Sequence, residues 1–384
     1  MKIGILAYRQ YPFISANTAI AYEVGQEITK SSKHEIVYIG RKQDKFQNQV
    51  NSHNGIDIKF LNKTVKKDTS CRLINIFKHI IGDSNYLFDA YNLKRIVKEN
   101  NINVLICIIA PIDNALITYY AKLDIPVYLY QLDPFYNNLD IVNPKLKAKF
   151  TKVLKSCKHL FTTDLLYKEY VNDRELQSFV TKMSVLGFPK LVDKPSYSID
   201  EEMVPFKNRL IYAGSLYHEI RSPQILIDLK KLLTDDFKLI FCGGCDRTED
   251  MEALRDSGIV CKGYCSQEVL DKEIQNSSYL INIGNKVRNQ LGSKIVDYVS
   301  TGKSIINLFQ FDECPTVAFL RNYSLKINIH INELNDIKTK EKIINYINNT
   351  QDKRLSFKDV EKTYWQYTPT CVARSILDKF DENI

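Results

Sequence analysis

Apolar runs of strand length alternate with longer amphipathic stretches throughout the first half of the chain. The runs that predict strands are residues 2–8, 35–41, 104–110, 127–132, 159–163 and 184–188. The stretches that predict helices between them are residues 18–30, 85–99, 114–122 and 144–155. Continuous runs of Val, Ile and Leu separated by helices are typical of a parallel sheet buried on both faces, so the pattern predicts a doubly wound α/β domain.

The second half repeats the same alternation from a new start. Strands are expected at residues 210–213, 238–242, 259–261, 279–283, 304–308 and 325–329, and helices at 223–233, 248–256, 267–275 and 293–301. Ser222 followed by Pro223 is a helix-start signal, because serine caps free N–H groups and proline suits the first helical position. We therefore predict an α/β protein with two Rossmann-like doubly wound domains facing a cleft.

Domain boundaries are predicted where this alternation is interrupted. A stretch with Pro195, Pro205 and two adjacent acidic residues shows little periodicity, which is typical of a linker. The predicted organisation is an N-terminal Rossmann-like domain (1–190), a linker (191–207), a second Rossmann-like domain (208–360) and a C-terminal helix (361–384) that packs back on the N-terminal domain.

The composition is that of an ordinary soluble globular protein. The 384 residues include 53 Lys plus Arg, 45 Asp plus Glu and 44% hydrophobic residues, which excludes disordered, collagen-like and coiled-coil chains. The longest apolar run, residues 104–111, is far shorter than the roughly 20 residues of a membrane span. The N-terminal apolar run lacks the length and the cleavage site of a signal peptide, so we expect a cytoplasmic protein.

Nine cysteines are scattered along the chain, an odd number that favours a reducing compartment over a disulfide framework. Four of them, Cys242, Cys245, Cys261 and Cys265, loosely resemble a zinc site, although the second pair has the spacing CxxxC. Two interpretations stay open: a zinc site, or four reduced thiols that pack as small apolar side chains.

The net charge of +8 is concentrated in the first half. Residues 1–200 contain 28 basic and 19 acidic side chains, a net of +9, whereas residues 201–384 contain 25 and 26, a net of −1. A basic half is compatible with a solvated surface, an anionic membrane or a phosphorylated substrate. No nucleic acid is expected as a partner, because no recognisable binding module accompanies the charge.

Several enzyme classes lack their signatures in this sequence. The first strand is not followed by G-x-G-x-x-G, and the chain has no P-loop, no G-x-S-x-G and no H-E-x-x-H. These absences exclude dehydrogenases, P-loop NTPases, α/β-hydrolases and zincins. Asp-x-Asp is also missing, and with it the usual carboxylate pair by which many nucleotide-sugar enzymes hold a divalent metal, so no metal and no cofactor are expected.

A small-residue loop, Gly214 and Ser215, follows the expected strand 210–213, and Arg221 stands just before the next helix. Free backbone N–H groups, a helix dipole and a guanidinium together suit a diphosphate. Taken alone, the same residues fit an ordinary βα turn better than a ligand site.

A second loop runs from Asn289 through Gly292 and Ser293 into the predicted helix 293–301. Gly292 is expected to turn the chain, and Ser293 to cap the helix. Asp297 follows near the end of the first turn, where its carboxylate can reach a ribose hydroxyl pair while the helix N-terminus holds phosphate.

These loops resemble those of the retaining GT-B glycosyltransferases, which are related to bacterial sugar transferases of polysaccharide assembly. Their motif is Glu-x7-Glu, and this chain has Asn289-x7-Asp297 followed by Gly302. Gly292, Ser293 and Lys294 similarly take the place of the first residues in a Pro-Ser-Lys-x-x-Glu-Tyr variant of the motif. Shorter matches lie at 212–217, at Arg221, at Gly263 with Tyr264, and at Tyr367-Thr368-Pro369 before a closing helix.

The resemblance implies a role for each matching residue. Asp297 would bind the ribose, Arg221 and Lys294 the diphosphate, and the Gly214–Ser215 loop the phosphates or the sugar. Tyr264 would lie beside the nucleobase. Because charge grows on the leaving diphosphate, Arg288 is a further candidate cation.

Two departures from the family pattern concern the transferred sugar and the acceptor. Asn289 replaces the Glu that contacts the sugar in the family, which leaves the stereochemical outcome open. The glycine pair of the acceptor loop is replaced by a segment that contains Asn17, and Asp133 follows a predicted strand, so both are acceptor-side candidates. Asp113 and Asp133 are also typical of helix or turn caps.

We therefore expect a metal-independent, retaining glycosyltransferase of bacterial-type surface polysaccharide or glycoconjugate synthesis. It would move a sugar from a nucleotide-diphosphate donor to a glycan or a lipid-diphosphate-linked acceptor. The expected location is the cytoplasm, with peripheral contact to the inner membrane face through the basic N-terminal half. The alternatives are a nucleotide-sugar-binding protein with impaired catalysis and a GT-B-shaped epimerase.

Overall fold

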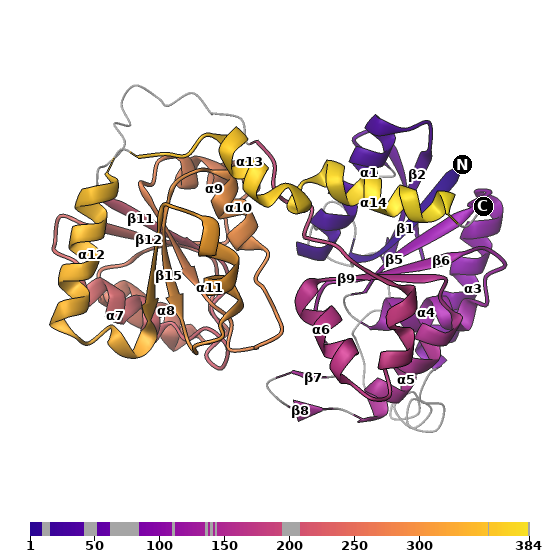
Figure 1. Ribbon diagram of the computed structural model, residues 1–384, viewed down its shortest axis with the longest axis horizontal. Helices are drawn as coiled ribbons and strands as arrows, with labels where there is room; N and C mark the ends of the chain where they lie inside the picture. The colour runs from indigo at the N-terminus through magenta and orange to yellow at the C-terminus, as the bar shows by residue number, and fades with distance from the viewer. Residues whose placement is uncertain are drawn as a thin grey trace. The chain divides into compact units, whose positions relative to one another are not determined.

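A computed structural model describes residues 1–9, 16–41, 52–61, 84–109, 112–134, 137–138, 141–142, 144–193, 208–351 and 353–382. The chain divides into two compact units, each with its own sheet and core (Figure 1). Unit 1 comprises Met1–Lys190 with Gln366–Ile384, and unit 2 comprises Leu191–Trp365. Most of the expected linker, residues 194–207, lies outside the described part of the chain.

Unit 1 is built on an eight-stranded sheet with the order β10-β9-β6-β5-β1-β2-β4-β3. Its strands are β1 (Lys2–Arg9), β2 (Glu35–Arg41), β3 (Ser52–His53), β4 (Ile56–Phe60), β5 (Val104–Ile109), β6 (Val127–Gln131), β9 (His159–Thr162) and β10 (Met183–Val185). All neighbouring pairs are parallel except β3 with β4. The central strand β5 is buried along its whole length, which explains its unbroken apolar sequence.

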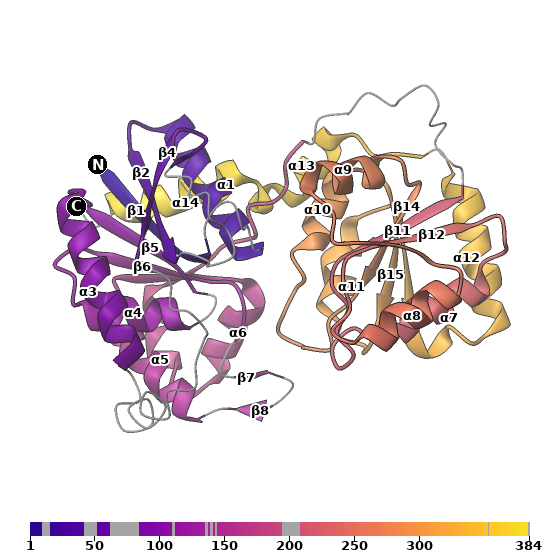
Figure 2. The ribbon, with the colours of Figure 1, turned by 180° about the vertical axis from the view of Figure 1, so that it is seen from behind.

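Helices cover both faces of this sheet (Figures 1 and 2). One layer contains α1 (Ala16–Ser31) and α14 (Pro369–Asp381), and the other contains α3 (Ser84–Glu99), α4 (Asp113–Ala121) and α5 (Pro144–Ser156). The short pair β7 (Asn137–Asn138) and β8 (Ile141–Val142) precedes α5, and α6 (Asp164–Asn172) with η1 (Gln177–Lys182) joins β9 to β10. Leu93, Leu105 and Leu116 belong to the apolar core between the sheet and the second layer.

Unit 2 is a six-stranded parallel sheet with the order β13-β12-β11-β14-β15-β16. Its strands are β11 (Arg209–Ala213), β12 (Lys238–Cys242), β13 (Val260–Gly263), β14 (Tyr279–Ile283), β15 (Ser304–Phe309) and β16 (Lys326–His330). Strands β11, β12 and β14 each contain an uninterrupted apolar run of three or four residues. The alternation of strands and helices that the sequence predicted is confirmed as doubly wound α/β architecture in both units.

The helices of unit 2 lie on the two faces of its sheet (Figure 2). On one face lie α7 (Gln224–Leu232), α8 (Thr248–Asp256) and α12 (Ile337–Thr350), and on the other lie α9 (Gln267–Gln275), α10 (Lys294–Ser300) and α13 (Phe357–Tyr364). The shorter elements α11 (Pro315–Phe319), η2 (Leu320–Asn322) and η3 (Ile331–Glu333) follow β15 and β16. No helix in the described ranges is both long and apolar enough to span a bilayer.

The end of the chain forms two helices instead of the single one expected over residues 361–384. The first, α13, belongs to unit 2, whereas α14 packs against α1 in unit 1. The break follows from local chemistry: the Thr368 hydroxyl accepts the Cys371 N–H at 3.1 Å, and Pro369 occupies the first helical position, where its missing N–H costs nothing. Helices α6 and α12 were not predicted.

Candidate functional site

The candidate site lies where the strand order of unit 2 reverses. The chain builds outward from β11 through β12 to β13, and then resumes on the other side of β11 with β14. The loops that leave β11 and β14 therefore diverge to opposite faces, where they lead to α7 and α10. Open parallel sheets bind ligands at such switch points, beyond the carboxyl ends of the strands.

The loop after β11 is clamped against the loop after β12. The Gly214 N–H donates to the Cys242 carbonyl at 2.9 Å. A Cβ at Gly243 would lie only 2.0 Å from the Gly214 carbonyl oxygen, so glycine alone lets the two backbones approach this closely. The position of the Gly214–Ser215 turn is thus set by backbone contacts.

Tyr264, which follows β13, lies beside this turn. Its side chain is 80% exposed, and its hydroxyl lies 3.4 Å from Ser215 Oγ. A Cβ at Gly244 would lie 2.5 Å from the Tyr264 ring, so that glycine makes room for the ring. An exposed aromatic ring next to a small-residue turn offers a stacking face for a nucleobase.

Arg221 closes the same loop, and its N–H donates to the Tyr217 carbonyl at 2.8 Å. Its guanidinium lies close to the Tyr212 phenol, whose pKa is raised by burial, against the opposing effect of the Arg221 charge. The phenol in turn donates to the Ser215 carbonyl at 3.4 Å. Arg221 Nε is buried and has no hydrogen-bond partner in the described ranges. A buried guanidinium N–H without an acceptor costs free energy, so Arg221 has a donor available for an anionic ligand group.

Helix α10 is tied to this loop from the opposite face of the sheet. The Tyr298 hydroxyl accepts the Ala213 N–H at 2.9 Å. A Cβ at Gly214 would lie 3.5 Å from Lys294 Cδ, so the aliphatic part of Lys294 runs beside the glycine turn. Asp297 lies in the first turn of α10 and is half-buried. The structure therefore brings together Gly214, Ser215, Tyr264 and Lys294 of the predicted donor residues.

The prediction that Ser293 caps α10 is wrong. Ser293 has helical dihedral angles, φ −60° and ψ −23°, and its side chain makes no capping hydrogen bond. Backbone contacts close the first turn instead, because the Ile295 N–H donates to the Gly292 carbonyl at 3.2 Å. At Gly292 nothing lies within 4 Å of the position that a Cβ would take, which leaves space for a ligand.

Arg288 contacts different residues from Arg221 and Lys294, the other predicted cations. Its guanidinium lies 3.3 Å from the Glu313 carboxylate and 5.1 Å from the centre of the Phe311 ring, both in the loop after β15. Its side chain is 60% exposed. Asn289, the next residue, is half-buried. The Arg288 guanidinium is therefore paired with an acid and an aromatic ring, which makes Arg288 a poorer candidate for binding the diphosphate.

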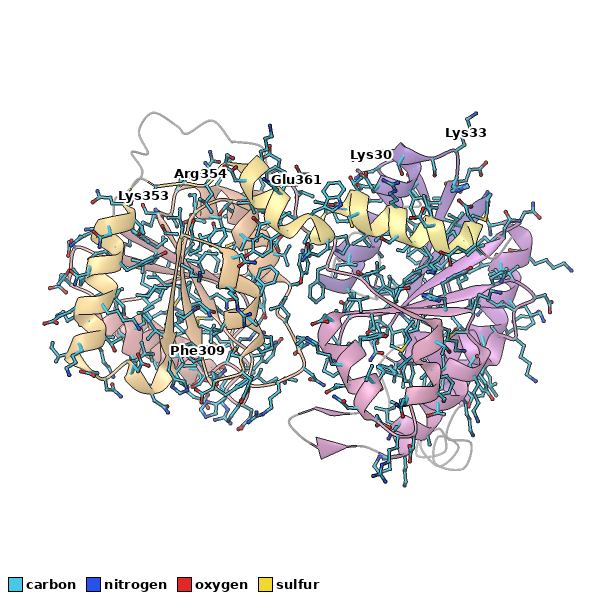
Figure 3. The ribbon with its side chains drawn as sticks, viewed as in Figure 1. Lys30, Lys33, Phe309, Lys353, Arg354 and Glu361 are labelled. Atoms are coloured by element: carbon cyan, nitrogen blue, oxygen red, sulfur yellow. The ribbon has the colours of Figure 1, made fainter. Side chains whose placement is uncertain are left out.

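The C-terminal end of α10 is fixed by the segment before α13. Gly302 has φ +69°, and a Cβ there would lie 2.1 Å from the Leu355 carbonyl oxygen, so glycine is required on both counts. Arg354 Nε donates to the Thr301 carbonyl at 2.7 Å (Figure 3). This anchoring positions the helix that carries Lys294 and Asp297.

The four cysteines near the site are separate thiols. Burial, followed by the neighbouring Cys265 thiol, raises the pKa of Cys242 to about 12. Burial, followed by Asp250, raises the pKa of Cys245 to about 11. No group of three or more His, Cys, Asp or Glu side chains in the described ranges is arranged to hold a metal ion. The reduced-thiol interpretation therefore fits the structure, and the zinc interpretation finds no support.

In unit 1 the two acceptor-side candidates contact each other. Asn17 Nδ2, near the start of α1, donates to Asp133 Oδ2 at 3.3 Å beyond the carboxyl end of β6. Asp113 has other partners, since it accepts from the Tyr86 hydroxyl at 2.9 Å and lies 3.8 Å from Arg41. The pair Asn17–Asp133 thus occupies the edge of the unit 1 sheet where a ligand is expected, whereas Asp113 belongs to an internal polar cluster.

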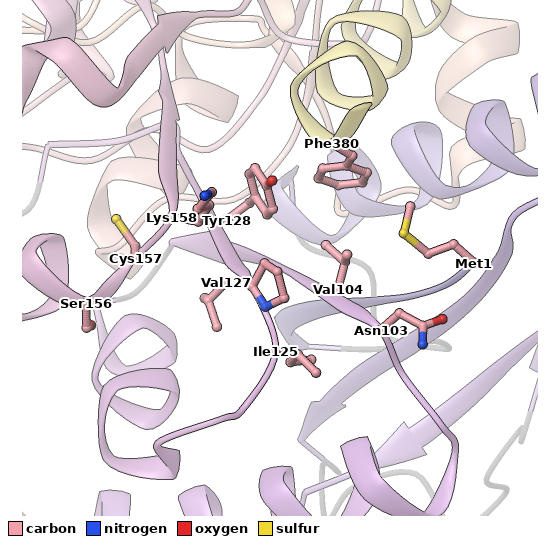
Figure 4. Close-up of a pocket in the computed structure, with 11 residues that line it drawn as sticks. Met1, Asn103, Val104, Ile125, Val127, Tyr128, Ser156, Cys157, Lys158 and Phe380 are labelled. Atoms are coloured by element: carbon pink, nitrogen blue, oxygen red, sulfur yellow. The ribbon is translucent and has the colours of Figure 1, made fainter. Parts of the chain in front are cut away.

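A pocket of about 500 Å³ lies at the other edge of the unit 1 sheet (Figure 4). Val104 and Val127, at the amino ends of their strands, line it together with Tyr128 and Phe380. Lys158 is its one cationic lining residue. The residues that line this pocket are mostly apolar and do not direct several polar groups to one point. The pocket therefore has no set of residues arranged for catalysis.

Three residues that shape the candidate site were not predicted from the sequence: Tyr212, Gly243 and Tyr298. The phenols act through contacts between distant segments, which no local spacing reveals. Gly243 could have been predicted, because two consecutive glycines end the strand 238–242. The flanking cysteines were instead interpreted as part of a possible zinc site.

Comparison with solved structures identifies the fold. Sucrose-phosphate synthase from Thermosynechococcus elongatus superposes with a TM-score of 0.71 at 9% identity, covering 99% of this chain and 98% of that one. A glycosyltransferase from Rickettsia africae gives 0.67 at 14% identity over 99% and 98%. Anabaena Alr3699/HepE, in complex with UDP and glucose, gives 0.66 at 9% identity over 99% of both chains.

Sequence comparison adds no relative: no protein-family model matches the chain, and no curated protein is significantly similar to it. The structural neighbours span both units of the chain. The fold is therefore that of the GT-B glycosyltransferases, with two Rossmann-like domains, as the motifs predicted.

Proposed function

We propose that the protein is a glycosyltransferase whose unit 2 binds a UDP-sugar or a related nucleotide-sugar donor. The observation that carries the proposal is Arg221, whose buried Nε has no partner in the described part of the chain and which closes the glycine turn at the switch point. The GT-B fold and the UDP bound to the Anabaena neighbour support a nucleotide-sugar as the donor.

In the proposed reaction the leaving diphosphate gains negative charge as the bond to the sugar breaks. Arg221 and Lys294 would stabilise this charge, and Asp297 would hold the ribose. The sequence contains no Asp-x-Asp motif, so we propose that Arg221 and Lys294 stabilise the leaving diphosphate without a bound metal. Retention of the anomeric configuration is part of the proposal, as in the family that the motif resembles.

A second function, nucleotide-sugar binding without transfer, is favoured by one observation. Asn289 stands where the resembling enzymes have Glu, so the contact to the transferred sugar differs. Prolonged incubation with donor separates the two functions, because only the transferase releases UDP.

Replacing Asp297 by Ala is expected to weaken UDP binding at least about tenfold, because hydrogen bonds to a charged group contribute about 1.5–3 kcal/mol. A thermal-shift screen of UDP-, GDP- and dTDP-sugars would select the donor, and calorimetry would compare the variants. Asp256→Ala, an exposed acid at the end of α8, is the control. Unchanged UDP binding in Asp297→Ala, or no thermal shift with any donor, would count against the proposal.

We further propose that unit 1 holds a glycan or lipid-linked acceptor at an anionic membrane surface. Exposed lysines lie along α5, among them Lys145, Lys152 and Lys155. In the same helix layer, α3 exposes Leu87, Phe88 and Tyr91, which are 50%, 62% and 69% exposed. Exposed apolar side chains and exposed lysines within one helix layer suit the interface of an anionic bilayer.

Changing the three α5 lysines to Glu is expected to lower binding to phosphatidylglycerol vesicles by at least about tenfold, because each lysine contributes about 1 kcal/mol. Co-sedimentation would measure the bound fraction, with pure phosphatidylcholine vesicles as reference. The matched control changes three exposed basic residues on the other layer: Lys30 in α1 and Lys33 just after it, both labelled in Figure 3, and Arg374 in α14. Equal losses in both triple variants would show a general charge effect and contradict a docking surface on α5.

A further inference from the structure

A second pocket in unit 2, with a volume of about 540 Å³, lies next to the proposed donor loop. It is lined from the end of the loop after β11, the start of α7 and the loops after β14, β15 and β16. None of Gly214, Ser215, Tyr264 and Asp297 lines it. Its size falls in the range of small-molecule sites, about 300–1,000 Å³.

The pocket is held in shape by Gln310. Its Nε2 donates to the Ile220 carbonyl at 2.8 Å and to the Gly284 carbonyl at 2.7 Å, so one side chain joins the loops after β11, β14 and β15. Ile220 immediately precedes Arg221 in the donor loop. The two sites therefore share one loop: Gly214 and Ser215 lie at its start, and Arg221 lies between the pocket-lining residues Glu219 and Ser222.

The lining determines what kind of ligand fits. Ile225 and Leu334, which are 6% and 2% exposed, give an apolar floor. Around it the walls present two carboxylates, four amides, a hydroxyl, an imidazole and an ammonium group: Glu219, Asp228, Gln224, Gln310, Asn332, Asn335, Ser222, His218 and Lys286. The imidazole of His218 lies 3.5 Å from the Asp250 carboxylate. An anionic ligand would face two carboxylates, and a hydrocarbon would leave the polar walls unpaired. A neutral ligand rich in hydroxyl groups satisfies both the walls and the floor, because hydroxyls donate and accept while sugar C–H faces are apolar.

Asp228 is positioned to be the main recognition group. Gln224 Nε2 and Lys231 Nζ reach its Oδ1 at 2.8 and 2.9 Å, which orients the carboxylate on the first turns of α7. Its side chain is only 21% exposed, so a hydrogen bond to it is partly shielded from water.

We infer that this pocket binds a neutral glycan, namely the part of the acceptor or product chain that extends beyond the reacting sugar. The inference rests on the proposed transferase function and adds the acceptor class to it. A chain bound there would be held by the same loop that carries Arg221, so acceptor binding would be coupled to the donor loop.

Binding of short neutral oligosaccharides, measured by saturation-transfer NMR on the full chain without donor, tests the inference. Probes built from glucose, galactose, mannose or N-acetylglucosamine are compared with sulfated analogues. At least one neutral probe is expected to bind. Asp228→Ala and, separately, Asn335→Trp are each expected to weaken it about tenfold or more. Asn335 is exposed, so the tryptophan blocks the pocket without disturbing the core.

Asp271→Ala is the matched control, because Gln267 and Asp271 form the same pair on α9, at 2.9 Å, as Gln224 and Asp228 form on α7. Binding in the control should equal that of the wild type. Absence of neutral-glycan binding, binding that ignores both pocket variants, or preference for the sulfated probes would each overturn the inference. Since no donor is present, a protein that binds glycans in the pocket but releases no UDP would refute only the proposed function.

Discussion

Replacing Arg221 by Gln is expected to lower the rate of UDP release from the donor by about 10²–10³-fold, the loss typical of removing one group that stabilises transition-state charge. Arg221 is held in place before any ligand arrives, because its guanidinium lies beside the buried Tyr212 phenol and its backbone is fixed by the tight turn to Tyr217. A preorganised cation stabilises developing charge without the cost of reorganisation. Gln keeps a hydrogen-bond donor at the position and removes the charge.

The effect of Arg221 should appear in turnover more than in donor binding. A UDP-release assay with the donor found by thermal shift would give kcat and KM separately. Arg321→Gln is the control, since this exposed arginine lies in η2, just before β16 and so at the opposite edge of the sheet. Arg221→Lys, which keeps the charge but lacks the fork of donors, should lose less activity than Arg221→Gln. Wild-type turnover in Arg221→Gln would remove Arg221 from the mechanism.

Most strands of the two sheets could be predicted closely because their information is local, whereas the short strands β3 and β4 of unit 1 were not predicted. Strands β2, β12 and β14 and helices α8 and α9 have the predicted bounds, since each is an uninterrupted periodic stretch ended by turn residues. The break before α14 could also have been predicted, because Thr368 and Pro369 are helix-start residues. The amphipathic pattern on both sides of them instead predicted one continuous helix. Element types follow from periodicity, whereas element ends depend on one or two capping side chains.

The candidate site was only partly predictable, for a related reason. Gly214 and Ser215 were found because small residues directly after a strand are a local signal, and Lys294 was found through the motif that resembles the GT-B glycosyltransferases. Arg288 lies just before that motif, but its partners Glu313 and Phe311 come from a loop more than twenty residues away and engage the guanidinium elsewhere. Sequence spacing identifies charged residues near a strand end, while the tertiary partners decide which of them face the ligand.

The core of unit 2 contains a cluster of charged side chains that no pattern in the sequence predicts. Glu273 on α9 accepts from Arg209 at the start of β11 and from Lys262 in β13. The side chains of Arg209 and Glu273 are only 8% and 11% exposed, whereas that of Lys262 is 37% exposed. Arg209 Nε has no further hydrogen-bond partner in the described ranges, so the guanidinium depends on this carboxylate for its compensation.

Replacing Glu273 by Gln is therefore expected to lower the free energy of unfolding of unit 2 by about 3–5 kcal/mol, because it leaves the buried Arg209 charge uncompensated. Glu268→Gln is the matched control on the same helix: its pair with Lys272, at 3.1 Å, joins two exposed side chains and is expected to contribute less than about 1 kcal/mol. Urea unfolding, combined with hydrogen–deuterium exchange of the β11 and β13 segments, would measure both variants. Equal stabilities would mean that Arg209 finds another acceptor or reaches water. A selective loss in Glu273→Gln would instead show that this cluster holds together the strands whose carboxyl ends carry the Gly214 loop and Tyr264.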